Sequence, residues 1–373
     1  MRYAEFLKKN GTIGFAAPSF GCAAQPYKGA FDNALKNFTQ IGYKCMLGPN
    51  CYAAEGIGIS STPKKCGEEL TQMYCSPDND VLISCGGGEL MCETLEYVDF
   101  DAVKNAEPKW YLGYSDNTNF TFLQTTLCDT ASVYGMCAGA FGMEPWHKSV
   151  DDTFSVLTGR GAVYSKSDEG GCGSKCSSDS GDGGCVSFKF NGYDKWEKES
   201  LKSEECPTAS MNVTEPRVIH VFNGDKRQPE NTSLSFSGRL IGGCMDCLVN
   251  LLGTKYDRVS QFNERYKEDG FIWFLESCDL NVFAIRRAMW QMDNAGWFKY
   301  LKGFIIGRPL VFGQELMGLD QYDAVLGIIG KYNVPVVMDI DLGHLSPTMP
   351  IICGSLGEVS VEGNDYSVGM RLV

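Results

Sequence analysis

Short apolar runs alternate with amphipathic segments over the first 145 residues, and this alternation restricts the fold more than any other feature of the chain. The apolar runs have the length of buried strands and lie at 12–19, 43–47, 80–85, 109–114 and 132–137. Apolar residues recur at helical spacing in 26–41, 62–73 and 116–128. Strands that alternate with helices favour a parallel sheet with helices on both faces, so we expect an α/β fold.

The chain has 373 residues, which exceeds one ordinary domain and indicates two. We expect an N-terminal α/β domain at 1–164 and a smaller C-terminal α/β domain at 235–373. In the second domain we expect strands at 270–277, 303–309 and 335–341, helices at 244–253, 282–292 and 318–330, and short β-pairs over the last 20 residues.

Residues 165–234 interrupt this rhythm, because they begin with a stretch that is poor in apolar residues and rich in Gly and Ser. We expect a flexible Gly/Ser/Cys-rich linker or lid here, with a solvated β-hairpin at 188–200. Cys172, Cys176 and Cys185 lie in this segment. A metal clip is one interpretation, but their spacing suits zinc poorly and no histidine is near, so we predict no metal site.

Charge and composition exclude several classes of protein. The formal net charge of −13 argues against a nucleic-acid partner, because binding to a phosphate backbone normally needs a basic face. The chain has no run of about 18 apolar residues and no apolar leader, so we expect no membrane partner, no signal peptide and a cytoplasmic location. The 17 cysteines are then expected to be reduced. For Cys244 and Cys247, which have CxxC spacing, core packing is favoured over a redox or metal role.

Histidine is scarce, and any Ser–His or Cys–His mechanism must use His147, His220 or His344. His220 lies in RVIHVF, whose alternation indicates a strand and a structural role. The context of His147 is uninformative. His344 follows the buried run PVVMDIDLG, and α/β proteins place their chemistry in loops at that end of strands. Position alone leaves a catalytic and a structural role for His344 equally open.

Ser115 lies at a strand-to-helix corner in the stretch YLGYSDNT, residues 111–118. The corner partly matches the nucleophile elbow G-x-S-x-G, but Asn117 stands where the second glycine would be. In such a turn the N–H of Asp116 points out of the new helix and can stabilise an oxyanion. Alternatively, Ser115 or Asp116 simply caps the helix, and this motif alone slightly favours capping.

A rival elbow is centred on Cys137, where Gly-Met-Cys-Ala-Gly fits the G-x-C-x-G pattern of class I glutamine amidotransferases. Those enzymes need a His-x-Glu pair further along the chain. His220 is followed by Val-Phe and His344 by Leu-Ser, so the pair is absent. A Cys137-dependent, amidotransferase-like enzyme is therefore the weaker alternative.

Gly86, Gly87, Gly88 and Glu89 follow the strand expected at 80–85. Neither a Walker lysine nor a G-x-G-x-x-G pattern accompanies them, so a phosphate-binding loop is not indicated. A turn in which backbone N–H groups approach a substrate oxygen suits this sequence better.

Several of these segments, taken in order, resemble one family, the serine peptidases that comprise LD-carboxypeptidases and microcin C self-immunity peptidases. The resemblance covers nearly the whole chain and rests on the segments IGFAAPS, SCGGGEL, KWYLGYSDNTNF, GRLIGGCMDCLVNLLGT, FIWFLES, GFIIGRP and PVVMDIDLGHLSP. The GYSD turn, the strand that ends in Leu-Glu and the strand that ends in Gly-His are specific as a set.

The resemblance implies a triad in which Ser115 is the nucleophile, His344 the general base and Glu276 the carboxylate that orients the histidine. It implies an oxyanion hole built from the backbone N–H groups of Gly88 and Asp116. It also implies a Rossmann-like N-terminal domain and a smaller C-terminal domain, with the active site between them.

The resemblance further suggests substrate contacts from Gly87, Glu89, Arg308 and Trp196. Arg308 would meet a carboxylate or phosphate, and Trp196 would stack on a nucleobase; a structural ion pair and ordinary packing are the respective alternatives. No cofactor is expected, and the partners expected are a small peptide or peptidyl-nucleotide substrate and a second copy of the chain in a homodimer.

Two substrate classes divide the family. LD-carboxypeptidases release a terminal D-residue from a cell-wall tetrapeptide, whereas the immunity peptidases cut the bond between an aminoacyl or peptidyl group and a sulfamoyl- or phosphoramide-linked nucleotide. This chain has Gly-Gly-Cys at 242–244 where the family often has Gly-Gly-Asn, and SCDLN after Glu276 in place of a proline-bearing turn. We expect a serine peptidase of one of these classes, with a slight preference for the second; an inactive relative that binds peptides or nucleotides is the alternative.

Overall fold

The structure, a computed structural model, describes residues 1–166 and 184–373. Its first sheet contains β1 (Thr12–Ala16), β2 (Lys44–Leu47), β3 (Val81–Ser84), β4 (Trp110–Gly113), β5 (Ser132–Tyr134) and β16 (Ile351–Cys353). The strand order is β16-β5-β4-β3-β1-β2; β1 to β5 are parallel, and β16 runs antiparallel to β5.

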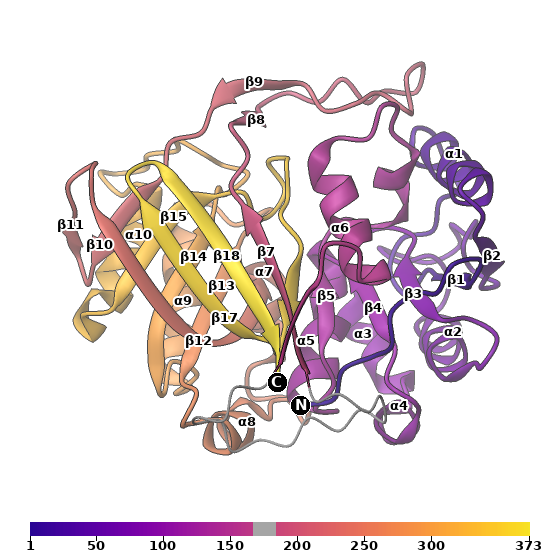
Figure 1. The fold of residues 1–373 in the computed structure, drawn as a ribbon, viewed down its shortest axis with the longest axis horizontal. Coiled ribbons are helices and arrows are strands. Elements are labelled where there is room, and N and C mark those ends of the chain that lie inside the picture. The colour runs from indigo at the N-terminus through magenta and orange to yellow at the C-terminus, as the bar shows by residue number, and fades with distance from the viewer. Residues whose placement is uncertain (167–183) are drawn as a thin grey trace.

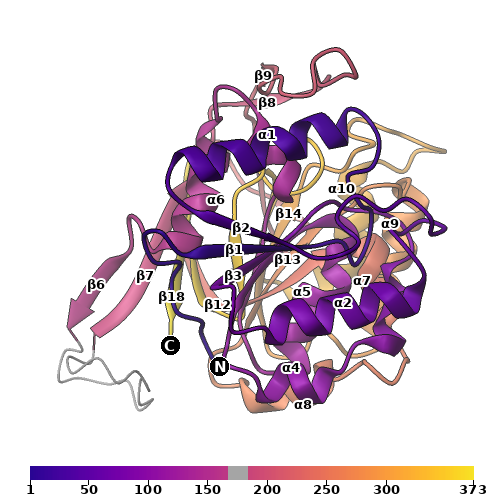
Figure 2. The ribbon, with the colours of Figure 1, turned by 90° about the vertical axis from the view of Figure 1, so that its right-hand side faces the viewer.

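Helices cover both faces of this sheet, as the alternation predicted. One face carries α1 (Tyr27–Gln40) and α6 (Lys148–Thr158), and the other carries α2 (Pro63–Cys75), α4 (Phe100–Asn105) and α5 (Thr118–Thr126). Figure 2 shows α1 and α2 on opposite sides of β1. Shorter helical turns are α3 (Met91–Thr94), η1 (Leu95–Tyr97), η2 (Ser115–Asn117) and η3 (Ala138–Gly142).

A second, larger sheet forms the neighbouring lobe (Figure 1). Its strands, in spatial order, are β11 (Lys226–Arg227), β10 (His220–Asn223), β15 (Pro335–Ile340), β14 (Leu301–Gly307), β13 (Phe271–Glu276), β12 (Ser233–Cys244), β17 (Leu356–Glu362), β18 (Asp365–Leu372), β7 (Gly184–Asn191) and β6 (Val163–Lys166). The central strands β12 to β15 are parallel, and the outer ones pair antiparallel.

The two faces of the second sheet pack against different partners. Trp273, Phe304 and Met338 share a core with the helices α7 (Met245–Leu251), α8 (Val259–Arg265), α9 (Val282–Asn294) and α10 (Gln321–Ile329); the 3-10 turn η4 (Gly330–Tyr332) follows α10. The alternate residues Ile272 and Val337 belong instead to the core that contains the strands of the first sheet. Because side chains alternate across a strand, one sheet can serve both cores. The mixed α/β architecture with two domains confirms the predicted fold class.

The segment expected to be a linker contributes strands to the second sheet. β7 pairs with β18 and β6, while β8 (Lys195–Glu197) pairs with β9 (Val213–Pro216), so the hairpin predicted at 188–200 is wrong. The reason is burial, because Phe188 and Phe190 of β7 face the core and keep that strand in the sheet. Residues 167–183, with Cys172 and Cys176, lie outside the described residues. The domain boundaries at 164 and 234 stay predictions.

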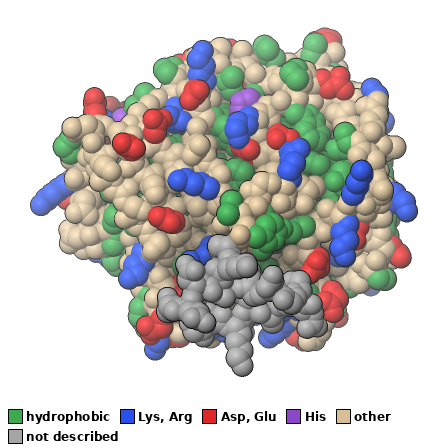
Figure 3. Space-filling model, viewed as in Figure 1, with side chains coloured by type: hydrophobic (Ala, Val, Ile, Leu, Met, Phe, Trp, Pro, Cys, Tyr) green, Lys and Arg blue, Asp and Glu red, His purple; other side chains and the backbone are tan. Residues whose placement is uncertain are grey.

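The two chain ends meet at one edge of the molecule (Figures 1 and 2), where the Tyr3 hydroxyl donates a hydrogen bond of 3.0 Å to the Val373 carbonyl oxygen. In the part of the chain that the structure describes, no helix has the length and apolar character needed to cross a membrane. The face in Figure 3 carries acidic and basic side chains interspersed. The absence of a nucleic-acid partner and the cytoplasmic location stay predictions.

Candidate active site

The three residues predicted to form a triad lie at the carboxyl ends of parallel strands. Ser115 begins η2 directly after β4, and Glu276 is the last residue of β13. His344 follows β15 on the connection that leads to β16, so this connection is anchored in both sheets. Since β4 belongs to one sheet and β13 and β15 to the other, the site lies between the lobes.

The side chains of these residues form one hydrogen-bonded chain. Nε2 of His344 is 2.9 Å from Oγ of Ser115, and Nδ1 is 2.8 Å from Oε2 of Glu276. When Nδ1 carries the proton and donates to the carboxylate, Nε2 is free to accept the hydroxyl proton. The structure therefore brings together residues that are far apart in the sequence.

Burial and mutual charge set the protonation of this pair. The Glu276 side chain is fully buried and that of His344 is 14% exposed. Burial raises the pKa of Glu276, but the positive charge of His344 and the hydrogen bonds from His344 and Tyr134 together lower it by more, so the pKa lies below its ordinary value. Burial lowers the pKa of His344, but the Glu276 carboxylate raises it, and the result lies well above the ordinary value. The carboxylate thus stabilises the imidazolium form of His344.

The backbone at Ser115 is strained. Its φ angle is +61°, in the left-handed region that costs a residue other than glycine about 1–3 kcal/mol. The serine does not cap a helix, because no side-chain cap hydrogen bond is present at the start of η2 or of α5. The capping interpretation of the serine is therefore wrong, and the sharp turn instead directs its hydroxyl to His344.

Asp116 does not cap the helix either, because its carboxylate binds groups outside the turn. Oδ2 accepts hydrogen bonds from the Ser19 hydroxyl at 2.5 Å and the Met91 N–H at 2.9 Å, and Oδ1 accepts from the Asn119 amide at 3.0 Å. Burial raises the pKa of this carboxyl. Within the described residues, the backbone N–H groups of Asp116 and Gly88 have no acceptor.

A cavity of about 450 Å³ opens beside Ser115 and His344. Gly87, Gly88 and Glu89 of the glycine-rich turn line it together with Asp116. The turn lies directly against the serine, since a Cβ atom added to Gly87 would be 3.1 Å from the Ser115 Oγ atom. Cys244, Asp246, Cys247, Cys278 and Asp279 from the second lobe also line the cavity.

Two residues that the sequence analysis missed complete the site. The Tyr134 hydroxyl donates a hydrogen bond of 2.5 Å to Oε1 of Glu276 and accepts one of 3.4 Å from the Ser115 N–H. Gly343 has a φ of +103°, and a Cβ atom there would be 2.6 Å from Oε2 of Glu276. Tyr134 is the last residue of β5, which pairs with β4. Its position at the end of a predicted strand was the only sequence feature that could have indicated a role in the site.

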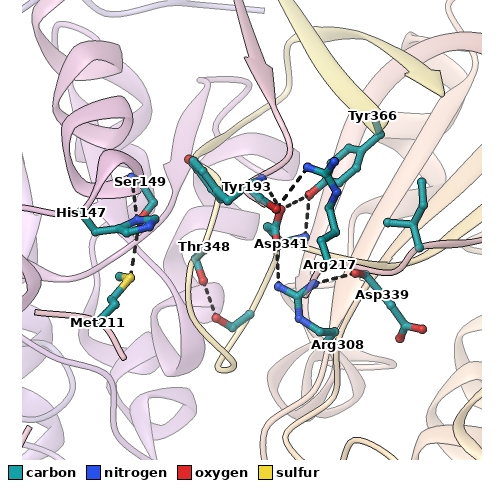
Figure 4. Close-up of polar contacts among 12 residues, drawn as sticks. His147, Ser149, Tyr193, Met211, Arg217, Arg308, Asp339, Asp341, Thr348 and Tyr366 are labelled. Carbon is teal, nitrogen blue, oxygen red and sulfur yellow. Dashed lines mark hydrogen bonds and ion pairs between the residues drawn. The ribbon is translucent and has the colours of Figure 1, made fainter. Parts of the chain in front are cut away.

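Arg308 and Trp196 do not lie with the other predicted site residues, and neither lines the cavity. Arg308 is 1% exposed, and its guanidinium pairs with the buried Asp341 at 2.5 Å (Figure 4). The Trp196 ring lies 5.3 Å from that guanidinium. Asp341 also accepts hydrogen bonds from the Tyr193 N–H and the Tyr366 hydroxyl, both at 2.7 Å. The structural ion pair is therefore the interpretation of Arg308 that fits its burial.

The remaining candidates for a base, His147 and His220, and for a nucleophile, Cys137, do not hydrogen-bond to one another or to the proposed triad. Nδ1 of His147 accepts a hydrogen bond from the Ser149 N–H at the start of α6, and His220 lies in β10 with its Nε2 3.8 Å from an Asp339 oxygen. Burial raises the pKa of Cys137 to about 12. None of the described residues that hydrogen-bond to its thiol is a histidine.

The cysteines form no metal centre in the part of the chain that is described, which holds no group of three or more His, Cys, Asp or Glu residues suited to a metal ion. Cys244 and Cys247 are free thiols buried at the cavity wall. The Cys247 thiol donates to the Ser115 carbonyl oxygen at 3.5 Å, and the Cys244 thiol donates to Asp246 at 3.3 Å.

The fold and this site between lobes agree with comparisons to known families. The family model described as the LD-carboxypeptidase N-terminal domain of peptidase family S66 matches residues 13–135, and the model of the C-terminal domain of that family matches residues 237–359. The chain therefore belongs to the S66 family of LD-carboxypeptidases, which confirms the resemblance that its motifs suggested.

Individual relatives match the chain over nearly its full length. The microcin C7 self-immunity protein MccF of Escherichia coli is 20% identical over 367 residues, which cover 97% of this chain and 94% of the relative. A crystal structure of an MccF-like protein from Bacillus anthracis has a TM-score of 0.76 at 18% identity and covers 99% of both chains. The structure of MccF in complex with glutamyl sulfamoyl guanosine also has a TM-score of 0.76, at 18% identity, and covers 99% of this chain and 98% of that one.

Proposed function

We propose that this protein is a serine peptidase that hydrolyses an amide bond with Ser115, His344 and Glu276 as its catalytic triad. The observation that supports this most directly is the hydrogen-bonded chain from the Ser115 hydroxyl through the His344 imidazole to the Glu276 carboxylate. Family membership supports the general class, since S66 enzymes are peptidases.

In the proposed reaction, Nε2 of His344 takes the Ser115 hydroxyl proton while Oγ attacks the substrate carbonyl carbon. Glu276 holds Nδ1 protonated and stabilises the imidazolium that forms. When the tetrahedral intermediate collapses, the same proton passes from Nε2 to the leaving nitrogen, and an acyl-enzyme remains. A water molecule that His344 deprotonates then releases the acid and restores the serine.

The proposed oxyanion hole consists of the backbone N–H groups of Asp116 and Gly88. Both residues line the cavity, and both N–H groups lack an acceptor within the described residues. The Asp116 N–H lies in the first turn after β4, where the helix dipole also favours negative charge. The Ser19 hydroxyl and the Met91 N–H hold the Asp116 side chain and so fix the orientation of this turn.

As substrate we propose an aminoacyl or peptidyl group linked through an amide-type bond to a sulfamoyl- or phosphoramide-bearing nucleotide. The full-length similarity to MccF supports this class, since MccF structures contain glutamyl sulfamoyl guanosine and aspartyl sulfamoyl adenosine. The second candidate is the LD-bond of a cell-wall tetrapeptide, which the description of the matching family favours. A homodimer stays a prediction.

The test is turnover of an aminoacyl-sulfamoyl adenosine and of a D-Ala-terminated tetrapeptide by the wild-type protein and by Ser115→Ala. We expect hydrolysis of the nucleotide conjugate and a fall in kcat of about 10⁴-fold or more in the variant. Cys137→Ser is the matched control, because it alters the rival nucleophile, and we expect it to retain turnover. Activity that survives in Ser115→Ala and disappears in Cys137→Ser would overturn the proposal.

A further inference from the structure

The cavity beside the proposed triad carries a marked excess of negative charge. Four carboxyl groups line it, namely those of Glu89, Asp116, Asp246 and Asp279. None of the described residues along its wall is Lys or Arg, and its one basic side chain is His344. The imidazole is already paired with the buried Glu276. The electrostatic potential in the cavity should therefore favour positively charged substrate groups over negatively charged ones.

Two of the four carboxylates are occupied by donors of the protein itself. Asp116 accepts from Ser19 and Met91, as described above. Asp246 accepts from the N–H groups of Cys278 at 3.0 Å and Asp279 at 2.8 Å, and so holds the turn after β13. These carboxylates shape the cavity and have little capacity left for a ligand.

The other two carboxylates, Glu89 and Asp279, are exposed at the cavity, and neither forms an ion pair with a described residue. Oδ1 of Asp279 accepts one weak hydrogen bond, from the Cys278 thiol at 3.7 Å. Glu89 ends the glycine-rich turn after β3, whereas Asp279 follows β13, so they reach the cavity from opposite lobes. Partial burial and then the negative charge of Asp279 raise the pKa of Glu89, which indicates that the two carboxyl groups repel each other. A cation placed between them relieves that repulsion.

Lys202 does not provide a cation for these two carboxylates. The Lys202 ammonium lies 5.6 Å from the centre of the Tyr27 ring at the edge of the cavity, and Lys202 itself is not among the residues that line it. Burial lowers the pKa of Lys202, which reduces its tendency to carry a charge. The negative charges of Glu89 and Asp279 are therefore not neutralised by a described lysine or arginine.

We propose that the site prefers substrates with a cationic side chain, an ammonium or a guanidinium, and that Glu89 and Asp279 select it. This inference rests on the proposed function, because it names the substrate class of the same cavity. The site should disfavour an acidic aminoacyl group, because the cavity has no lysine or arginine along its described wall to pair with the carboxylate of that group.

The test compares lysyl-, alanyl- and aspartyl-sulfamoyl adenosine as substrates of the wild-type protein, Glu89→Gln and Asp279→Asn. All three conjugates carry the same α-ammonium group, so differences report the side chain. We expect kcat/KM in the order lysyl, alanyl, aspartyl, and we expect each neutral variant to reduce the lysyl-to-aspartyl ratio by about fivefold. Added salt should reduce the wild-type ratio as well, because it screens partly exposed charges.

Glu96→Gln is the matched control, since it removes one exposed carboxylate of the same lobe that does not line the cavity. It should leave the ratio unchanged. A wild-type ratio of one or less would overturn the inference, and so would a ratio that Glu89→Gln and Asp279→Asn leave unchanged. Both results would leave the proposed hydrolysis intact.

Calorimetric binding of the same conjugates to Ser115→Ala separates the two proposals. If the wild-type protein hydrolyses none of the conjugates, the proposed function fails. The affinities of Ser115→Ala for the three conjugates still test whether the cavity prefers a cationic side chain. Tighter binding of the lysyl than of the aspartyl conjugate supports the inference, and equal or reversed affinities overturn it.

Discussion

Removing the Tyr134 hydroxyl is a single-atom test of how the carboxylate of the proposed triad is held. Tyr134 and Glu276 are both 0% exposed, and the hydrogen bond between them is 2.5 Å long. A hydrogen bond to a charged group contributes about 1.5–3 kcal/mol net, and at this depth water cannot readily replace the lost donor. We therefore expect Tyr134→Phe to lower the free energy of unfolding by about 2 kcal/mol, about a 30-fold change in the unfolding equilibrium constant.

The measurement is urea-induced unfolding followed by tryptophan fluorescence. Tyr114→Phe is the control, because the Tyr114 ring lies 5.2 Å from the His344 ring and its hydroxyl has no hydrogen bond to a described residue. The control loses an equivalent hydroxyl beside the same site without affecting Glu276. If the two variants unfold within about 0.5 kcal/mol of each other, the Tyr134–Glu276 bond does not stabilise the fold as argued.

Two further variants test the geometry of the proposed triad. Glu276→Gln removes the negative charge that raises the His344 pKa. Because His344 must be neutral to act as a base, the acidic limb of the kcat/KM pH profile should move to lower pH, and kcat should fall by about 10³-fold or more. An acidic limb that does not move would contradict the pairing of His344 with Glu276. Gly343→Ala should lower kcat by at least about tenfold, because the new Cβ atom would lie 2.6 Å from Oε2 of Glu276. Gly296→Ala is the control in the same assay, since Gly296 also has a positive φ, +75°, but has open space around it. Equal activity of the two variants would refute the steric argument.

Much of the fold could be predicted because burial leaves a local signature. The runs that became β1, β3, β4, β13 and β15 are apolar and short, and α1, α2 and α9 show helical spacing. β7 could not be assigned in this way. Its burial depends on pairing with β18, in which Phe190 faces Val368, 178 residues further along the chain (368 − 190). Nothing within 188–200 indicates that partner.

The candidate site was partly predictable for a related reason. Ser115, Glu276 and His344 belong to motifs that a family resemblance can recognise, and each follows or ends an apolar run. Arg308 also belongs to such a motif, GFIIGRP, yet its guanidinium is buried against Asp341 instead of facing the cavity. A motif reports that a residue is constrained, and it does not report whether a ligand or another side chain constrains it.

The local sequence pattern was enough to predict the α/β class, the strand ends at which chemistry is expected, and the residue types available there for catalysis. This is possible because backbone periodicity and turn preferences depend on only a few neighbouring residues. Folding alone determined that Tyr134 supports Glu276, that Ser115 adopts a strained turn without capping its helix, and that Glu89 and Asp279 approach one cavity from two lobes. These relations depend on packing between segments far apart in the chain, where distance and dielectric environment are properties of the assembled molecule.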